Sequence, residues 1–176
     1  MAHDQPFNKM FGQELIQHNA FTLGIAIAIR CEKEHGAQTK GTVMTENEAI
    51  VEELNELLGN YITCIETQDR TMFDKVWTTE GTCRMISGVN MFDGRESLWG
   101  KFVDGKIKTA YTTIKIVKEN SWFEVIDEDH ALIIFKYHTE CILRENGEPF
   151  GVAGLETQVA KRDPEGWRLL HVHYSK

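Results

Sequence analysis

Apolar residues recur at three- and four-residue spacing from position 46 to position 67, with charged and polar residues between them. This spacing places the apolar side chains on one face of an α-helix. They are Ile50, Leu54, Leu57, Leu58, Tyr61, Ile62 and Ile65. Thr45 and Glu48 have the Ser/Thr-x-x-Glu spacing of a capping box, which begins helices. The pattern therefore predicts one amphipathic helix over 46–67. Shorter helices are predicted in "TMFDKVWTTEG", ending at Gly81, and in "RESLWGKFVDG".

Farther along, the sequence changes to the two-residue period of β-strands. Two short runs, "TCRMISG" and "VNMFDG", surround a turn. Four longer runs, rich in β-branched and aromatic residues, are "YTTIKIVKENSWFEVI", "HALIIFKYHTECILRE", "FGVAGLETQVAKRD" and "WRLLHVHYS". The short connections "DED", "ENGEP" and "PEG" suit antiparallel neighbours. This order predicts an α+β domain, in which three helices pack on one face of a curved antiparallel sheet.

Alternation divides the side chains of each strand between two faces. In "HALIIFKYHTECILRE", Phe135 and Tyr137 share a mainly apolar face, whereas Lys136, His138 and Glu140 share the other. A polar stripe on a long strand is solvated, paired across an interface, or turned into a polar cavity. The sequence leaves these alternatives open.

The last two strands raise the same question. Glu156 and Gln158 share one face of their strand, and His171 and His173 share one face of the final strand. The alternate residues of the final strand make the better core face. We expect the two histidines to form hydrogen bonds on an interface or a pocket wall. Metal binding is not expected, because no third ligand accompanies them at the spacing of a metal motif.

The chain has 176 residues, 41% of them hydrophobic, and a formal net charge of −8. This length and composition suit one folded domain with an appendage. The charge argues against a nucleic-acid partner, since phosphate contacts need clustered Lys and Arg. Cys31, Cys64, Cys83 and Cys141 have no C-x-x-C spacing. They are typical of isolated thiols in a reducing compartment, which favours the cytoplasm over export.

The stretch "FTLGIAIAI", residues 21–29, is nearly all apolar. A helix needs about 20 such residues to span a bilayer, so we expect no membrane anchor. Three interpretations stay open. The stretch is a short buried helix or strand added to the domain, or residues 1–30 act as an export signal. In the third, the first 43 residues lie outside the functional unit or before the natural start, since a good helix start follows Met44. We therefore separate an N-terminal extension, 1–44, from the domain, 45–176.

Three stretches carry a family resemblance: "YITCIETQDRTMFDKVW", "VNMFDGRESLW" and "ETQVAKRDPEGWRLLHVHYS". They resemble the nuclear-transport-factor-2-like superfamily, which includes ketosteroid isomerases, SnoaL-like polyketide cyclases and the association domain of calcium/calmodulin-dependent protein kinase II. The last stretch is most similar to the association domain, whose final strands run as E-T-R-V, a charged turn, G-x-W and alternating histidines. The resemblance implies a cone-like domain whose three helices pack on the concave face of the sheet, with a pocket between the helices and that face. It also implies dimers formed by packing sheet against sheet.

The comparison with ketosteroid isomerases implies catalytic candidates. Tyr61 falls where these enzymes keep a tyrosine that donates a hydrogen bond, although an aromatic residue there also suits the core. Their catalytic base falls near Met85, which cannot take a proton. Glu140, Glu156 or a histidine could then substitute from another wall, and His138 or Glu140 is the predicted base. Their second hydrogen-bond donor falls near Gln158.

The comparison with the association domain implies a pocket rich in arginine, suited to an anionic guest. Here the E-T-R motif reads Glu156-Thr157-Gln158, so one arginine is missing. Arg84, in an early strand, is the candidate to restore the positive charge, with Glu140 or Glu156 as its partner. The candidate ligand-binding residues are Trp77, Arg84, Glu156, Gln158 and His171.

Two functions follow from the resemblance. The first is a stand-alone SnoaL-like domain that binds a small organic molecule, anionic or carbonyl-containing. If it is an enzyme, it isomerises, cyclises or dehydrates that molecule by acid–base chemistry, without cofactor or metal. The second is a non-catalytic association domain, whose outer sheet face with Lys136, His138 and His173 packs against another subunit. Both imply a homo-oligomer, dimeric or larger.

Overall fold

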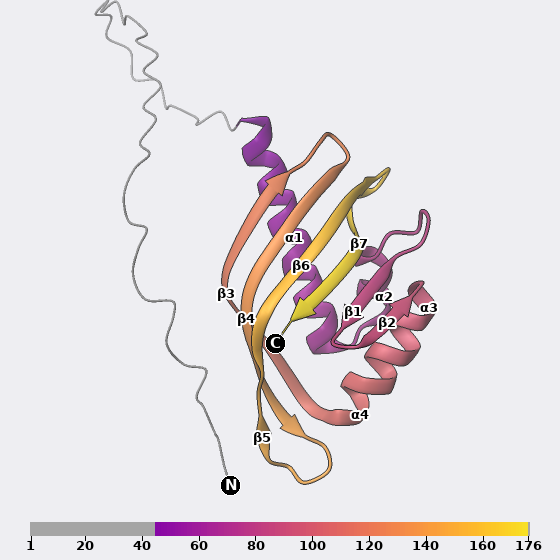
Figure 1. Ribbon diagram of the computed structural model, residues 1–176, viewed down its shortest axis with the longest axis vertical. Helices are drawn as coiled ribbons and strands as arrows, with labels where there is room; N and C mark the ends of the chain where they lie inside the picture. Colours follow the sequence, from indigo (N-terminus) through magenta and orange to yellow (C-terminus); the bar gives the residue numbers. More distant parts are fainter. Residues whose placement is uncertain (1–44, 176) are drawn as a thin grey trace, which may run out of the picture. The chain divides into compact units, whose positions relative to one another are not determined.

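The structure is a computed structural model that describes residues 45–175. In this part of the chain, helices cover one face of a curved sheet of seven strands (Figure 1). The helical segments are α1 (Glu46–Thr67), α2 (Arg70–Val76), α3 (Arg95–Ser97), η1 (Leu98–Ile107) and α4 (Lys108–Ala110). The strands are β1 (Arg84–Ser87), β2 (Asn90–Asp93), β3 (Tyr111–Val125), β4 (His130–Leu143), β5 (Pro149–Phe150), β6 (Ala153–Asp163) and β7 (Gly166–Ser175).

The predicted fold class, an α+β cone with helices on the concave face of its sheet, is confirmed. The predicted N-terminal extension and its apolar stretch lie outside the described residues. None of the described helices is long and apolar enough to cross a membrane. The three cysteines of the described part, Cys64, Cys83 and Cys141, are buried free thiols. The cytoplasmic location inferred from the cysteines stays a prediction.

α1 has the bounds that the apolar spacing predicts. The backbone N–H of Thr45 donates to Oε2 of Glu48 over 2.7 Å, and the N–H of Glu48 donates to Oγ1 of Thr45 over 3.3 Å. These reciprocal bonds satisfy donors that a helix start otherwise leaves without partners. α1 ends where Gln68 adopts the left-handed conformation, with φ at 54°, and its N–H bonds the carbonyl of Cys64. The apolar stripe between these ends is buried against the sheet.

α2 is shorter than the sequence predicts. It begins after Asp69, whose side chain accepts hydrogen bonds from two backbone N–H groups of the first turn. It ends at Val76 instead of continuing to Gly81. Trp77 is already extended and forms a parallel bridge to Leu169 of β7. A buried tertiary contact therefore outweighs the local helical preference here.

The third helical segment is longer than predicted, because α3, η1 and α4 follow one another without a break from Arg95 to Ala110. η1 has the wider turn of a π-helix. Glycine suits this turn, since a Cβ at Gly105 would lie 3.1 Å from the carbonyl oxygen of Gly100. η1 buries Phe102 and Ile107.

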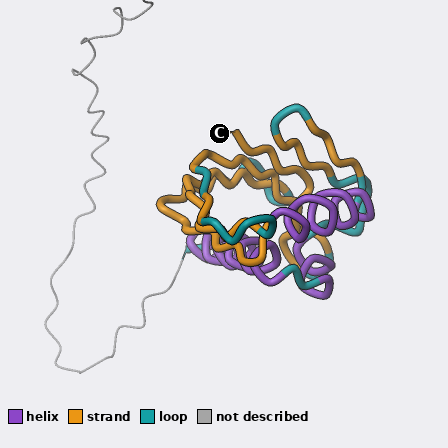
Figure 2. The backbone as a smooth tube through the Cα atoms, turned by 90° about the horizontal axis from the view of Figure 1, so that it is seen from below, coloured by secondary structure: helices purple, strands orange, loops and turns teal. Residues whose placement is uncertain are grey.

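The sheet has the order β2-β1-β7-β6-β4-β3, with β5 paired to β4. Neighbouring strands are antiparallel except for β1 and β7, which are parallel. The sheet is therefore mixed, not wholly antiparallel as expected. Bulges interrupt the register of β3 between Lys118 and Asn120, and that of β7 between Leu169 and His171. Bulges increase twist and bend strands, and the sheet curls towards the helices (Figure 2).

Strand alternation gives the sheet two faces with different chemistry. Ile133, Phe135 and Tyr137 of β4 are buried on the concave face, which we call the inner face. Lys136 and His138 lie on the opposite, outer face. The inner face and α1 together form one hydrophobic core, and the cavity described below lies in it.

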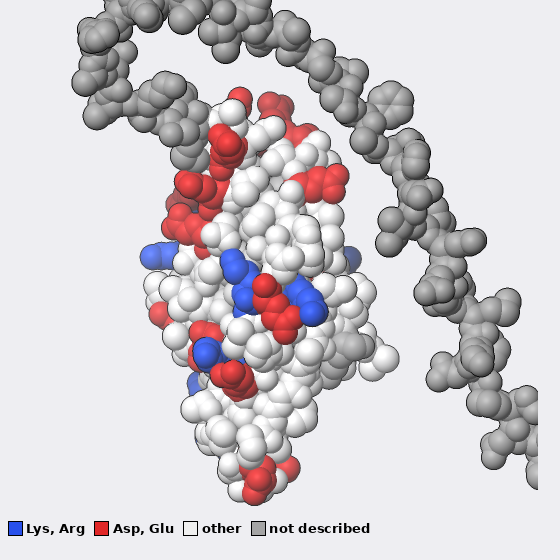
Figure 3. Space-filling model, turned by 90° about the vertical axis from the view of Figure 1, so that its left-hand side faces the viewer, with Lys and Arg blue, Asp and Glu red and all other residues white. Residues whose placement is uncertain are grey.

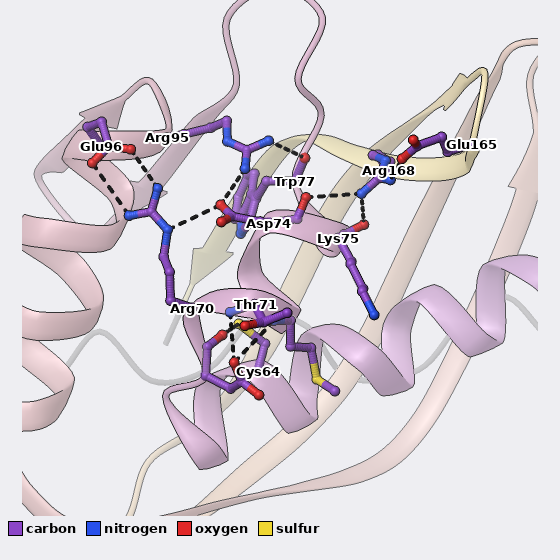
Figure 4. A network of polar contacts seen from close by, with 12 residues as sticks. Cys64, Arg70, Thr71, Asp74, Lys75, Trp77, Arg95, Glu96, Glu165 and Arg168 are labelled. Carbon is purple, nitrogen blue, oxygen red and sulfur yellow. Dashed lines mark hydrogen bonds and ion pairs between the residues drawn. The ribbon is translucent and has the colours of Figure 1, made fainter.

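Ion pairs hold α2 to the start of the third helical segment (Figure 4). Asp74 of α2 bonds Arg95 and lies 3.1 Å from Nε of Arg70. Arg70 also reaches Glu96, with an Nη2–Oε1 distance of 2.6 Å. Arg168 of β7 donates to backbone carbonyls in the last turn of α2, which a helix end leaves without partners. These contacts fix the position of α2 relative to β7 and to the start of the third helical segment.

Candidate functional site

A cavity of ≈ 140 Å³ lies between α1, η1 and the inner face of the sheet. Its wall is mostly apolar, built from aliphatic and aromatic side chains of these elements and of β3 and β4. Its polar residues are Tyr61, Tyr111, Tyr137, Thr139, Glu156 and Tyr174. A space of this size holds about one six-membered ring, since a cavity of about 150 Å³ in another protein binds benzene. The cavity lies where the resemblance implied a pocket.

Glu156 is the one carboxylate among the described residues that line this cavity. Glu156 is only 4% exposed, and Nε2 of Gln158 donates to its Oε1 over 2.7 Å. The hydroxyl of Tyr61 lies near this carboxyl group and favours its ionised form. Burial raises the pKa of Glu156 to about 7, and the Gln158 amide and the Tyr61 hydroxyl oppose that rise. Near neutral pH both protonation states are therefore populated, as proton transfer requires.

Tyrosine side chains from three elements line the cavity near Glu156. Tyr61 of α1 and Tyr137 of β4 are buried, and Tyr174 of β7 is half-buried opposite Glu156 in the sheet register. Burial raises the pKa of each phenol, and the charge of Glu156 raises it further. The Ser87 hydroxyl donates to the oxygen of Tyr174. All three phenols are therefore neutral at pH 7 and keep an O–H donor.

Tyr137 and Tyr174 were not among the predicted site residues, although alternation already placed both on core faces. The signal that could have found them is chemical. A phenol turned into an apolar core needs a polar partner for its hydroxyl. Glu156, on the adjacent strand and also on the inner face, is near both hydroxyls.

His138 and Glu140, the predicted catalytic partners of Tyr61, lie on the outer face, so the structure does not bring them together with Tyr61. Nδ1 of His138 is 2.9 Å from Oε1 of Glu119, and Oε2 of Glu140 is 3.4 Å from Nζ of Lys115. Glu140 borders an open cleft beside β5 instead of the inner cavity. The apolar side of β4 packs into the core, so the sheet separates both residues from Tyr61.

Arg84 and His171, predicted as ligand-binding residues, do not line the cavity. They are register neighbours on the parallel strands β1 and β7. Nε of Arg84 bonds Oδ1 of Asp93 over 3.1 Å, not Glu140 or Glu156. Burial lowers the pKa of His171, and the charges of a neighbouring histidine and Arg84 lower it further. The expected arginine is therefore absent from the described lining.

Trp77 and Gln158 are buried behind the cavity wall. Trp77 is 1% exposed, and its ring meets that of Tyr61 edge-on, with centroids 6.5 Å apart. This contact restricts the Tyr61 ring and so holds its hydroxyl towards Glu156. Gln158 is fully buried and reaches the site only through its bond to Glu156. Both residues position the lining instead of forming it.

The outer face is the surface that the resemblance assigns to subunit contact. Trp122 of β3 and Leu155 of β6 are 49% and 47% exposed there. Half-buried Ile134 of β4 and Val159 of β6 lie on the same face. The charged residues of β3 and β4 pair with one another, so basic and acidic groups intersperse on this side of the molecule (Figure 3). The face thus combines exposed apolar side chains with charges that are already compensated.

The match to a known family rests on the strands and helices that build this site. Residues 50–176 match the calcium/calmodulin dependent protein kinase II association domain. The chain belongs to this family. The resemblance drawn from the sequence is therefore confirmed. No curated protein matches the chain.

Solved structures share the fold of this association-domain protein. A nuclear transport factor 2-like superfamily protein from Salmonella enterica serovar Typhimurium is 22% identical, with a TM-score of 0.70, covering 73% of this chain and 92% of that one. The association domain of C. elegans CaMKII is 20% identical, with a TM-score of 0.54, covering 74% and 95%. A hexachlorocyclohexane dehydrochlorinase from Novosphingobium barchaimii is 13% identical, with a TM-score of 0.64, covering 72% and 86%. At these identities the similarity concerns the fold alone.

Proposed function

We propose that the inner cavity binds a small organic molecule and that Glu156, as the acid–base group, moves a proton from one atom of this molecule to another. Tyr61 is the hydrogen-bond donor. The observation that carries this proposal is the position of the Glu156 carboxyl group, in the wall of an apolar cavity of ≈ 140 Å³. A buried carboxyl whose pKa is about 7 exchanges protons readily near neutral pH.

The Tyr61 hydroxyl, which lies near Glu156, suggests how binding activates the base. The phenol has a single hydrogen, which stabilises the ionised carboxylate. A ligand oxygen that accepts this hydrogen instead leaves the carboxylate less stabilised, and so more basic. Glu156 then removes a proton from the carbon beside a carbonyl, while Tyr61 donates to the oxygen that gains charge. The protonated Glu156 then returns the proton: to another carbon in an isomerisation, to the new alkoxide in a cyclisation, or to the departing hydroxyl in a dehydration, which leaves as water.

Deuterium exchange tests this function without knowledge of the product. Cyclohexanone in D₂O is followed by NMR for loss of the protons beside its carbonyl. We expect the protein to accelerate exchange, and Glu156→Gln to reduce that acceleration by about 10² to 10⁴-fold. Glu128→Gln, in the exposed β3–β4 turn, is the matched control and should exchange at the native rate. Equal rates in both variants would exclude Glu156 as the base.

A filled cavity provides the second test. Ile116 lines the cavity, whereas Ile126 is 58% exposed at the end of β3. Ile116→Phe should abolish exchange and ligand-induced stabilisation, and Ile126→Phe should leave both intact. Retention of exchange in Ile116→Phe would place the chemistry elsewhere.

We also propose that the outer face joins copies of the chain into a homo-oligomer. Its support is the pair of exposed apolar residues, Trp122 and Leu155, together with membership of a family described as an association domain. Light scattering gives the mass of the native protein in solution. Leu155→Arg should reduce that mass to the monomer, because it buries a charge at the interface. Val89→Arg, fully exposed in the β1–β2 turn, should leave it unchanged. A native monomer at micromolar concentration would rule out this association.

A further inference from the structure

We infer that the cavity selects an uncharged, single-ring molecule with a carbonyl or hydroxyl oxygen, and that it rejects carboxylates and other anions. This inference rests on the proposed function, because it concerns the ligand of the same cavity. It differs from the anionic guest that the arginine-rich pocket of the association domain led us to expect. The reasons are the charge, the hydrogen-bonding groups and the shape of the lining.

The charge of the lining disfavours anions. Among the described residues that form the wall, none is Lys, Arg or His, and Glu156 is the one acid. Arg84, the arginine expected to hold an anion, is on the outer face and paired with Asp93. An anion entering the cavity would lose its hydration without gaining a cation. It would also face the negative charge of ionised Glu156 in an apolar surrounding, where repulsion is strong.

The polar groups of the lining favour a neutral oxygen. The hydroxyls of Tyr61, Tyr137 and Tyr174 are all neutral donors at pH 7, because burial raises the pKa of each. A neutral carbonyl oxygen accepts such bonds without carrying a charge into the core. A ligand hydroxyl or amide N–H can also donate to the carboxylate of Glu156. The lining thus matches a ligand with both an acceptor and an uncharged donor.

The shape of the lining favours a planar ring. The volume of ≈ 140 Å³ is close to that which accommodates benzene elsewhere. Tyr111 and Phe150 lie with ring centroids 6.1 Å apart at an interplanar angle of 19°. Phe102 and Tyr174 lie 6.3 Å apart across another side of the wall. Aromatic side chains on two sides contact the faces and edges of a flat ring efficiently.

Binding of an anion must therefore depend on pH. The groups that face Glu156 are the phenols of Tyr61, Tyr137 and Tyr174 and the amide of Gln158, and none of these is a cation. An anion is tolerated only while Glu156 carries its proton. Since its pKa is about 7, the protonated fraction falls about tenfold between pH 6 and pH 8. The affinity for a neutral ligand has no such requirement.

Benzamide and benzoate form a matched pair of probes, equal in shape and different in charge. NMR chemical shifts of the cavity residues, followed during titration at pH 8, should show that benzamide and phenol bind. The affinity for benzoate should be at least about tenfold lower than that for benzamide. Benzoate should bind about tenfold more tightly at pH 6 than at pH 8. Glu156→Gln should bind benzoate equally at both pH values, because the titrating charge is gone.

The outcomes separate this inference from the proposed function. If benzoate binds native protein at pH 8 as tightly as benzamide does, the inference is wrong, while the cavity remains a ligand site. If benzamide, phenol and benzoate all leave the cavity residues unshifted, the cavity binds no small ring and the proposed function fails with it. The pH series on native protein decides the inference even if Glu156→Gln does not fold.

Discussion

Nε2 of Gln158 donates a 2.7 Å hydrogen bond to Oε1 of Glu156, two residues away on the inner face of β6. Gln158 is 0% exposed and Glu156 is 4% exposed. Within the described residues, Oε1 of Gln158 has no hydrogen-bond partner. A buried amide with an unpartnered acceptor is destabilising by itself. Its position beside Glu156 indicates that fixing this carboxyl group outweighs that cost.

The buried carboxyl group makes stability depend on pH in a defined window. Below the ordinary value of 4.5, Glu156 is protonated in both states; above it, the unfolded chain ionises while the folded protein keeps its proton up to about pH 7. The free energy of unfolding therefore falls between pH 4.5 and 7 by about 3 kcal/mol, at about 1.4 kcal/mol per pKa unit, and is flat beyond. Urea unfolding across this range should show the fall in native protein relative to Glu156→Gln. If the free energy of unfolding changed with pH in the same way in native protein and in Glu156→Gln, that result would contradict the raised pKa.

Two substitutions separate positioning from ligand contact. Gln158→Leu and Tyr61→Phe each remove a donor to the ionised carboxylate, so both should move the NMR titration midpoint of Glu156 above 7. Gln158 does not line the cavity, whereas Tyr61 does. We therefore expect Tyr61→Phe alone to weaken benzamide binding measured at pH 6, by about tenfold for one hydrogen bond. An equal loss in Gln158→Leu would mean that Tyr61 acts only by positioning Glu156.

Strand alternation predicted much of this site, because it depends only on local sequence. It placed Phe135 and Tyr137 on one face of β4, and Glu156 with Gln158 on one face of β6. The two-sided pattern of β4 also predicted that His138 lies opposite Tyr137. What alternation does not provide is the identity of the face that α1 covers.

The position of the other predicted residues depends on packing and pairing that the local sequence does not provide. His138 or Glu140 is the predicted base because Met85 stands where the isomerases keep theirs. Both lie on the outer face, since burying the apolar side of β4 stabilises the fold more than burying a charged stripe. Arg84 lies on a strand of only 4 residues, whose direction is set by pairing with β2 and β7. Its partner Asp93 follows a turn, and nothing local distinguished that partner from Glu140 or Glu156.

A glycine in β6 tests how tightly the cavity wall is built. A Cβ at Gly154 would lie 2.2 Å from the backbone oxygen of Ser175 and 3.3 Å from the hydroxyl of Tyr137. Gly154→Ala should therefore destabilise the protein by about 1–3 kcal/mol and shift the NMR signals of Tyr137. Gly59→Ala, on the open side of α1 with nothing within 4 Å, should stabilise it by about 0.5–1 kcal/mol. Urea unfolding of the two variants measures both signs, and a stable Gly154→Ala would show that β7 yields easily.

The free edge of the sheet is protected by a side chain of α1. β3 ends the strand order, and the backbone N–H of Ile116 donates to Oε1 of Glu66 over 2.6 Å. Glu66→Ala should lower the free energy of unfolding by about 1 kcal/mol, because this donor loses its charged acceptor. Glu66→Gln keeps an acceptor and should recover much of the loss. Glu52→Ala, exposed on the same helix, should change stability by less than about 0.5 kcal/mol.

An uncovered edge also pairs with other chains, so we expect Glu66→Ala to aggregate faster than Glu52→Ala in light scattering. Equal stability and equal aggregation in the two alanine variants would mean that water replaces Glu66 at this edge without cost.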